Sequence, residues 1–143
     1  MKNAETKIRV RYKETDQMGV VHHSNYYTWF EAARTEFMRN GGLSYRQLEE
    51  MGIMLPLLET HCTYLHGAKY DDVVIIRTRL THYAGVRLTM EYEAIREEDG
   101  LLLAKGSTVH AFTDSNLKPL NVKKKHPEIH KLFLELMDAN TDK

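Results

Sequence analysis

The stretch SNYYTWFEAARTEFMRNGG, residues 24–42, decides the fold of this chain. Apolar side chains recur in it at the spacing of one helix face, at Tyr26, Phe30, Ala33 and Phe37. The Asn-Gly-Gly run at residues 40–42 favours an end to the helix, since glycine commonly follows a last helical turn. We therefore predict a long helix from Ser24 that buries Trp29, Phe30 and Phe37.

Strands are expected on both sides of this helix. Before it, residues 7–12 alternate apolar and charged side chains, which is the period of a half-buried strand. After it, Ser44 and Gln47 form a capping box for a short helix that should stop near Gly52. Further strands are expected at residues 54–65, 73–83, 86–94 and 101–113, with a turn at 98–100 and a terminal helix from Pro127. This order predicts an α+β fold in which an antiparallel sheet wraps the long helix.

Length, charge and cysteine content narrow the class of protein. A chain of 143 residues fits a single domain, residues 1–143. Basic and acidic side chains both total 20, so the overall charge gives no indication of nucleic-acid binding. Cys62 is the single cysteine, the N-terminus lacks the apolar run of a secretory signal, and no stretch approaches the ~20 apolar residues of a transmembrane helix. We expect a cytoplasmic protein.

Residues 12–34, YKETDQMGVVHHSNYYTWFEAAR, contain the candidate chemistry. A helix N-terminus presents backbone N–H groups without intrahelical partners, and these favour a developing oxyanion. Asp16, in a glycine-containing turn beside that terminus, could act as a nucleophile or as a general base for water. Hydrolysis of an acyl group needs these two parts. Asp16 also suits an ordinary turn, in which its carboxylate bonds only nearby backbone.

This stretch, together with AKYDD at 68–72 and VHAFTD at 109–114, resembles the signature of the 4-hydroxybenzoyl-CoA thioesterase and YbgC/FadM branch of the hotdog superfamily. The resemblance covers about residues 7–135. It implies a hotdog fold that hydrolyses acyl-CoA, or an acyl carrier protein thioester, without a cofactor. It assigns Asp16 as the catalytic carboxylate, His23 as the backbone N–H that polarises the thioester carbonyl, and Tyr12 as a supporting residue. A role for the His23 imidazole stays open.

Candidate substrate-binding residues surround this segment. They are Gly19, Val20, Ser24, Asn25, Tyr26 and, near the CoA phosphates, Arg87. Ser24 and Asn25 are also ordinary helix caps, and Glu31 should face solvent. The acyl group is expected against Tyr26, Tyr27 and residues 53–55. Lys118 and the run at 123–125 are alternative phosphate contacts or a solvated surface.

Metal binding is not predicted, because His126 and His130 have helical chelate spacing but lack a convincing third ligand. A single sheet leaves two unpaired edges, so we expect a homodimer formed edge to edge, possibly paired again into a tetramer, with the Asp16 loop facing residues 61–70 of the second copy. Two alternatives remain. One is a non-catalytic acyl-CoA-binding module. The other is a hotdog hydratase or dehydratase, whose Asp-x-Asn-x-x-His arrangement this sequence lacks.

Overall fold

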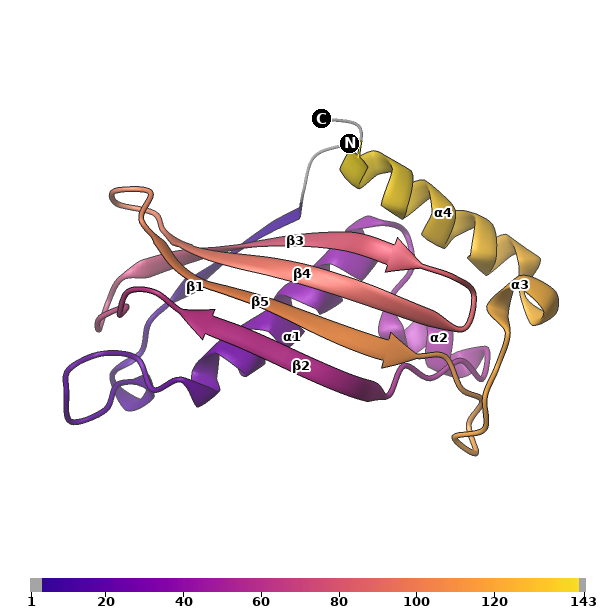
Figure 1. The fold of residues 1–143 in the computed structure, drawn as a ribbon, viewed down its shortest axis with the longest axis horizontal. Helices are drawn as coiled ribbons and strands as arrows, with labels where there is room; N and C mark the ends of the chain where they lie inside the picture. The colour runs from indigo at the N-terminus through magenta and orange to yellow at the C-terminus, as the bar shows by residue number, and fades with distance from the viewer. Residues whose placement is uncertain (1–3, 142–143) are drawn as a thin grey trace.

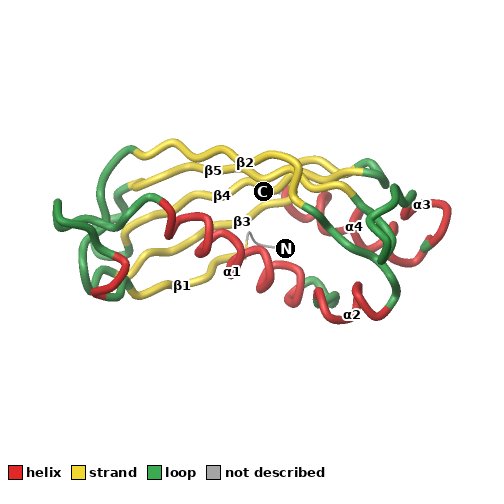
Figure 2. Tube along the Cα trace, turned by 90° about the horizontal axis from the view of Figure 1, so that it is seen from below, coloured by secondary structure: helices red, strands yellow, loops and turns green. Residues whose placement is uncertain are grey.

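A five-stranded antiparallel sheet lies over one long helix in this computed structural model, which describes residues 4–141 (Figures 1 and 2). The strand order is β1-β3-β4-β5-β2. The strands are β1 Ala4–Arg9, β2 Leu57–Tyr64, β3 Val73–Tyr83, β4 Arg87–Arg96 and β5 Leu102–Ala111. The predicted α+β architecture is confirmed, while residues 1–3 and 142–143 of the predicted single domain lie outside the described residues.

The long helix α1 spans Ser24–Asn40, as the sequence predicts. The other helices are α2 Tyr45–Glu50, α3 Val122–Lys125 and α4 Pro127–Thr141, and a 3₁₀ helix spans Tyr12–Glu14. The predicted capping box of α2 is present, with Ser44 N–H donating to Gln47 Oε1 at 2.8 Å and Gln47 N–H donating to Ser44 Oγ at 3.1 Å. α3 was not expected. Among the described residues, no helix is long and apolar enough to cross a membrane.

The core forms where α1 presses on the middle of the sheet. Trp29, Phe30 and Phe37 are at most 2% exposed, so the predicted core residues are confirmed. Phe30 stacks on Tyr92 of β4 with ring centroids 4.6 Å apart. A Cβ at Gly106 would lie 2.4 Å from the Phe30 ring, so glycine in β5 is what lets the helix approach this closely. This contact fixes how α1 lies on the sheet.

Two strand predictions are wrong at their ends. β1 stops at Arg9, because the chain turns into the 3₁₀ helix, and this leaves Tyr12 79% exposed instead of half-buried in a strand. β2 begins at Leu57, and Met54 forms only an isolated bridge with Thr113. Pro56 precedes the strand and has no N–H to donate to a ladder.

The edge strand β2 is largely uncovered. Its side chains are exposed along the whole strand except for a half-buried Cys62. Leu57 is 54% exposed and Tyr64 44%, which is unusual for an apolar strand of a sheet. The sequence predicted an apolar strand here but not that it would lie at an open edge.

Candidate active site

A cavity of about 270 Å³ lies where the loop before α1 meets the end of β2. The residues that line it are Asp16, Met18, Val20, Val21, His23, Tyr26, Tyr64, Leu65, His66 and Gly67. Four of the predicted site residues, Asp16, Val20, His23 and Tyr26, are thus brought together. Residues 64–67 of the same chain form the opposite wall, where the sequence analysis expected the second copy.

Asp16 occupies a tight turn that aims its carboxylate at the cavity wall. One carboxylate oxygen, Oδ1, accepts the Met18 N–H at 2.8 Å. The Asp16 carbonyl accepts the Gly19 N–H at 3.0 Å, and Gly19 has a φ of 81°, a left-handed conformation that glycine adopts without strain. The second oxygen of Asp16 has no hydrogen-bond partner among the described residues. The turn role and a chemical role are therefore compatible, because each uses a different oxygen.

The start of α1 leaves one backbone donor free. Val21 N–H donates to the Ala68 carbonyl at 2.8 Å, and His22 N–H to the Glu14 carbonyl at 2.8 Å. The N–H groups of residues 24–26 also find acceptors, whereas the His23 N–H has none in the part of the chain that the structure describes. His23 and Asp16 line the same cavity, so the residue with the unpaired donor and the residue with the carboxylate meet there. The geometry suits an oxyanion.

Helix capping differs from the prediction. His23 holds the N-cap position without a capping side-chain bond, and the helix already includes Ser24 and Asn25. The Nδ1 atom of His22 accepts the Ser24 N–H at 3.2 Å and lies 2.8 Å from Ser24 Oγ. Histidine is not among the preferred N-cap residues, so this cap could not be predicted from the sequence. The His22 ring also stacks on His23, with centroids 4.2 Å apart.

Glu14 is a buried carboxylate that sequence reasoning missed. It is 3% exposed and accepts hydrogen bonds from Arg11 N–H at 2.7 Å and from the Trp29 indole at 3.1 Å. Its carbonyl accepts the Asn25 side-chain amide at 3.0 Å. Burial raises the pKa of Glu14, but the hydrogen bonds from Arg11 and Trp29 outweigh it, and the net shift is downward. Glu14 thereby ties the Asp16 loop to α1.

We expect Glu14→Ala to lower the free energy of unfolding by about 2–4 kcal/mol, because two donors lose their acceptor, one of them the buried indole N–H. Urea unfolding followed by tryptophan fluorescence measures this loss. Glu97→Ala is the matched control: it removes a carboxylate that pairs with Lys7 at the surface, and we expect a change of at most about 1 kcal/mol. Equal losses for the two variants would contradict a supporting role for Glu14.

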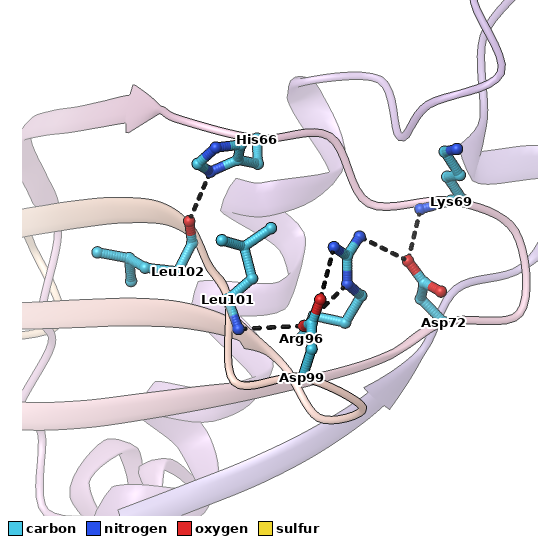
Figure 3. Close-up of polar contacts among 7 residues, drawn as sticks. All are labelled: His66, Lys69, Asp72, Arg96, Asp99, Leu101 and Leu102. Carbon is cyan, nitrogen blue, oxygen red and sulfur yellow. Dashed lines mark hydrogen bonds and ion pairs between the residues drawn. The ribbon is translucent and has the colours of Figure 1, made fainter.

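A second loop, residues 65–72, braces the first. Asp72 accepts the Lys69 N–H at 2.9 Å and lies 3.8 Å from the Arg96 guanidinium, which also bonds Asp99 (Figure 3). A Cβ at Gly67 would lie 2.6 Å from the Val20 side chain, so the two loops touch directly. The AKYDD segment also bonds the Asp16 loop, because the Ala68 carbonyl accepts the Val21 N–H.

Other predicted site residues lie outside this cavity. Tyr12 is on the outer side of the loop, edge-on to Tyr70, in a separate hollow that Asp16 also lines. Arg87 begins β4, at the end of the sheet opposite the Asp16 loop, beside the turn at Gly85 whose carbonyl accepts the Val122 N–H (Figure 1). The sequence alone could not reveal that Arg87 lies far from the Asp16 loop, because the position of Arg87 depends on the direction in which β4 runs in the sheet.

The expected acyl wall is also divided. Ile53 is buried in the core and Met54 pairs with Thr113, and neither lines the Asp16 cavity. Tyr27 lines a neighbouring cavity between α1 and β2. His130, which was considered as a metal ligand, lies 2.6 Å from the Tyr83 hydroxyl through Nδ1.

Comparison with known proteins gives the family. A profile described as the thioesterase-like superfamily matches residues 10–135. The chain belongs to the thioesterase-like superfamily. It is 36% identical to a putative esterase of Aquifex aeolicus, over 86% of this chain and 94% of the relative. It is 31% identical to the putative acyl-CoA thioesterase YneP of Bacillus subtilis, over 89% and 92% of the two chains.

Solved structures of this superfamily match the whole fold. The DHNA-CoA thioesterase of Staphylococcus aureus superimposes with a TM-score of 0.90 at 32% identity, covering 97% of this chain and 93% of that one. The hotdog fold implied by the sequence resemblance is thereby confirmed. As a member of the thioesterase-like superfamily, the chain is an enzyme of the thioester hydrolase class.

Proposed function

We propose that the protein hydrolyses acyl-CoA to a free carboxylic acid and CoA in the cavity between Asp16 and the start of α1. The observation that carries this proposal is that one cavity is lined by His23, whose N–H is unpaired in the described chain, and by Asp16, which keeps one free carboxylate oxygen. The thioester carbonyl would accept the hydrogen bond from His23 N–H, which strengthens as negative charge develops on the oxygen. The positive end of the α1 dipole adds to this stabilisation.

Asp16 then acts in one of two ways. As a nucleophile, its free oxygen attacks the thioester carbon, the C–S bond breaks, and water cleaves the resulting anhydride. As a general base, it takes a proton from a water molecule that attacks the same carbon, and the departing thiolate recovers the proton. Both routes release the acid and CoA. Both require the carboxylate and not its amide.

His23→Ala tests how the position works, because alanine keeps the backbone N–H and removes the imidazole. We expect less than a tenfold loss of kcat/KM, since the proposal assigns the oxyanion contact to the backbone. CoA release from a panel of acyl-CoAs, measured with a thiol reagent, gives the rates. A loss as large as that of an Asp16 variant would instead assign the chemistry to the ring. Failure of the wild-type protein to release CoA from any substrate would overturn the proposed function.

We also propose that the active species is a homodimer formed by antiparallel pairing of two β2 edges. Antiparallel pairing would place Leu57 of one copy near Tyr64 of the other. The end of the sheet that carries Arg87 would then lie on the same side of the dimer as the other copy's Asp16 loop. Arg87 and the exposed lysines of α3 would then be available to the CoA phosphates. A further pairing of dimers into tetramers and a cytoplasmic location are compatible with this arrangement.

A further inference from the structure

A second cavity, of about 390 Å³, lies between α1 and β2. Tyr27 lines this second cavity and Tyr64 lines the first, and the two side chains interact with each other. Arg34, Thr60 and Thr108 contribute polar groups to the second cavity. Tyr27 follows His23 by four residues, so the two cavities are neighbours about one helical turn apart along α1.

Arg34 is a half-buried cation without a counter-ion in this cavity. Its Nε donates to the Tyr45 hydroxyl at 2.6 Å and its Nη1 to the Tyr92 hydroxyl at 3.2 Å. Both partners are neutral phenols, since burial raises the pKa of Tyr45 to about 12 and also raises the pKa of Tyr92. Among the described residues no carboxylate pairs with Arg34. Glu31 lines the same cavity but is exposed and forms no ion pair with it.

A chain of buried hydrogen bonds fixes which groups in this wall donate. His110 Nδ1 lies 3.1 Å from the Leu55 carbonyl and must donate to it, because a carbonyl only accepts. Burial lowers the pKa of His110 to about 4, so the ring is neutral and Nε2 accepts from the Thr108 hydroxyl at 3.0 Å. Thr108 must then accept from the Tyr92 hydroxyl at 2.7 Å, and Tyr92 from Arg34.

The direction of this chain decides what the cavity can recognise. Both phenols accept from Arg34, and the Thr108 hydroxyl and the His110 ring beyond Tyr92 are committed to their neighbours, so none of these groups neutralises the guanidinium. The remaining Nη hydrogens are donors without acceptors in the described chain. A ligand must supply acceptor oxygens, and a carboxylate matches the guanidinium fork in both charge and shape.

We propose that this cavity receives the far end of the acyl group and that Arg34 selects acyl groups that end in a carboxylate. The inference rests on the acyl-CoA hydrolysis proposed above. Arg34 follows Ser24 by ten residues, roughly 15 Å along the helix, and helical side chains lean toward the N-terminus. Because Tyr45 of α2 and Tyr92 of β4 hold the guanidinium, it stays roughly 10–15 Å from the start of α1, a distance that a medium-length to long acyl chain can span.

Matched substrates test the selection. Succinyl-, adipoyl- and suberoyl-CoA are each compared with the methyl-ended acyl-CoA of the same length, butanoyl-, hexanoyl- and octanoyl-CoA. We expect the carboxylate-ended substrate to have at least a ~10-fold higher kcat/KM at one length or more, the effect of a charge-assisted hydrogen bond. A wild-type enzyme that hydrolyses the methyl-ended substrate faster at every length overturns the proposal, while thioester hydrolysis itself still stands.

Variants assign the preference to the guanidinium. In Arg34→Met we expect the ratio of the two rates to fall below about threefold, and Arg34→Lys should retain part of it. Arg39→Met is the control on the same helix, since Arg39 is exposed and paired with Glu36, and its ratio should equal that of the wild type. An unchanged ratio in Arg34→Met overturns the proposal. An Arg34→Met variant that keeps the wild-type ratio of rates but no longer dimerises also overturns the proposal. That result would mean that Arg34 pairs with Glu31 of a second copy and not with the substrate.

Discussion

Asp16→Asn is expected to keep the fold and to lower kcat/KM for acyl-CoA by at least about 100-fold. The amide can still accept the Met18 N–H through its oxygen, so the turn at residues 16–19 should survive. It cannot take a proton from water or attack the thioester carbon as a carboxylate does. The low end of the contribution from a positioned acid or base is ~100-fold, which sets the expected minimum. Steady-state CoA release and circular dichroism together measure both properties.

Asp114→Asn is the matched control for this change. Asp114 also caps a turn through one carboxylate oxygen, which accepts the Asn116 N–H at 2.8 Å, but it does not line the Asp16 cavity. We expect its activity to stay within about twofold of the wild type. An Asp16→Asn enzyme that retains more than a tenth of the activity would remove Asp16 from the centre of the reaction.

The sequence predicted the fold well because its elements carry strong periodic signals. α1 and β3 have the bounds that the apolar spacing indicated, and the capping box at Ser44 was found as expected. The same reasoning predicted the strand β2 but not its position at an open edge of the sheet. The apolar pattern of a strand is the same whether its own chain or a second copy covers it. The strand prediction for residues 10–12 failed for another reason: the turn there is held by Glu14, whose carboxylate bonds Arg11 locally and Trp29 on α1, 15 residues away.

The site was predicted in part. Asp16 and His23 could be chosen because a carboxylate and a helix start occur within one short segment, and the structure places both in one cavity. Glu14 could not be chosen, because nothing in a polar turn signals that its carboxylate is buried against Trp29. Arg34 was equally hidden. Its cavity depends on residues from β2 and β5, which only the strand order brings together.

The two edges of the sheet differ in a way that bears on assembly. Along β1, Glu5, Lys7 and Arg9 form ion pairs with residues of the same chain, and such charges discourage pairing with another strand. Along β2, Leu57, Leu58 and Tyr64 are each more than 40% exposed. A hydrophobic open edge favours a second copy, and a twofold axis allows the β2 edges of two copies to cover each other, leaving only the charged β1 edges open.

Cys62→Pro is therefore expected to give a monomer with activity reduced by about 100-fold or more. Leu65 N–H donates to the Leu103 carbonyl in β5, so strand alternation turns the Cys62 N–H outward, toward a second copy. Proline removes that donor and leaves the pairing with β5 largely intact. The loss of activity follows if groups of the second copy position the substrate, because small misplacements cost about this much.

Lys7→Pro is the control at the other edge, where register with β3 also turns the N–H outward. It should remain a dimer and stay active, although somewhat less stable. Light scattering combined with activity, for both variants and for the wild type across a dilution series, measures mass and rate together. We expect wild-type activity per chain to fall as the dimer dissociates on dilution. A fully active species at the monomer mass of 16.7 kDa would refute the requirement for two copies.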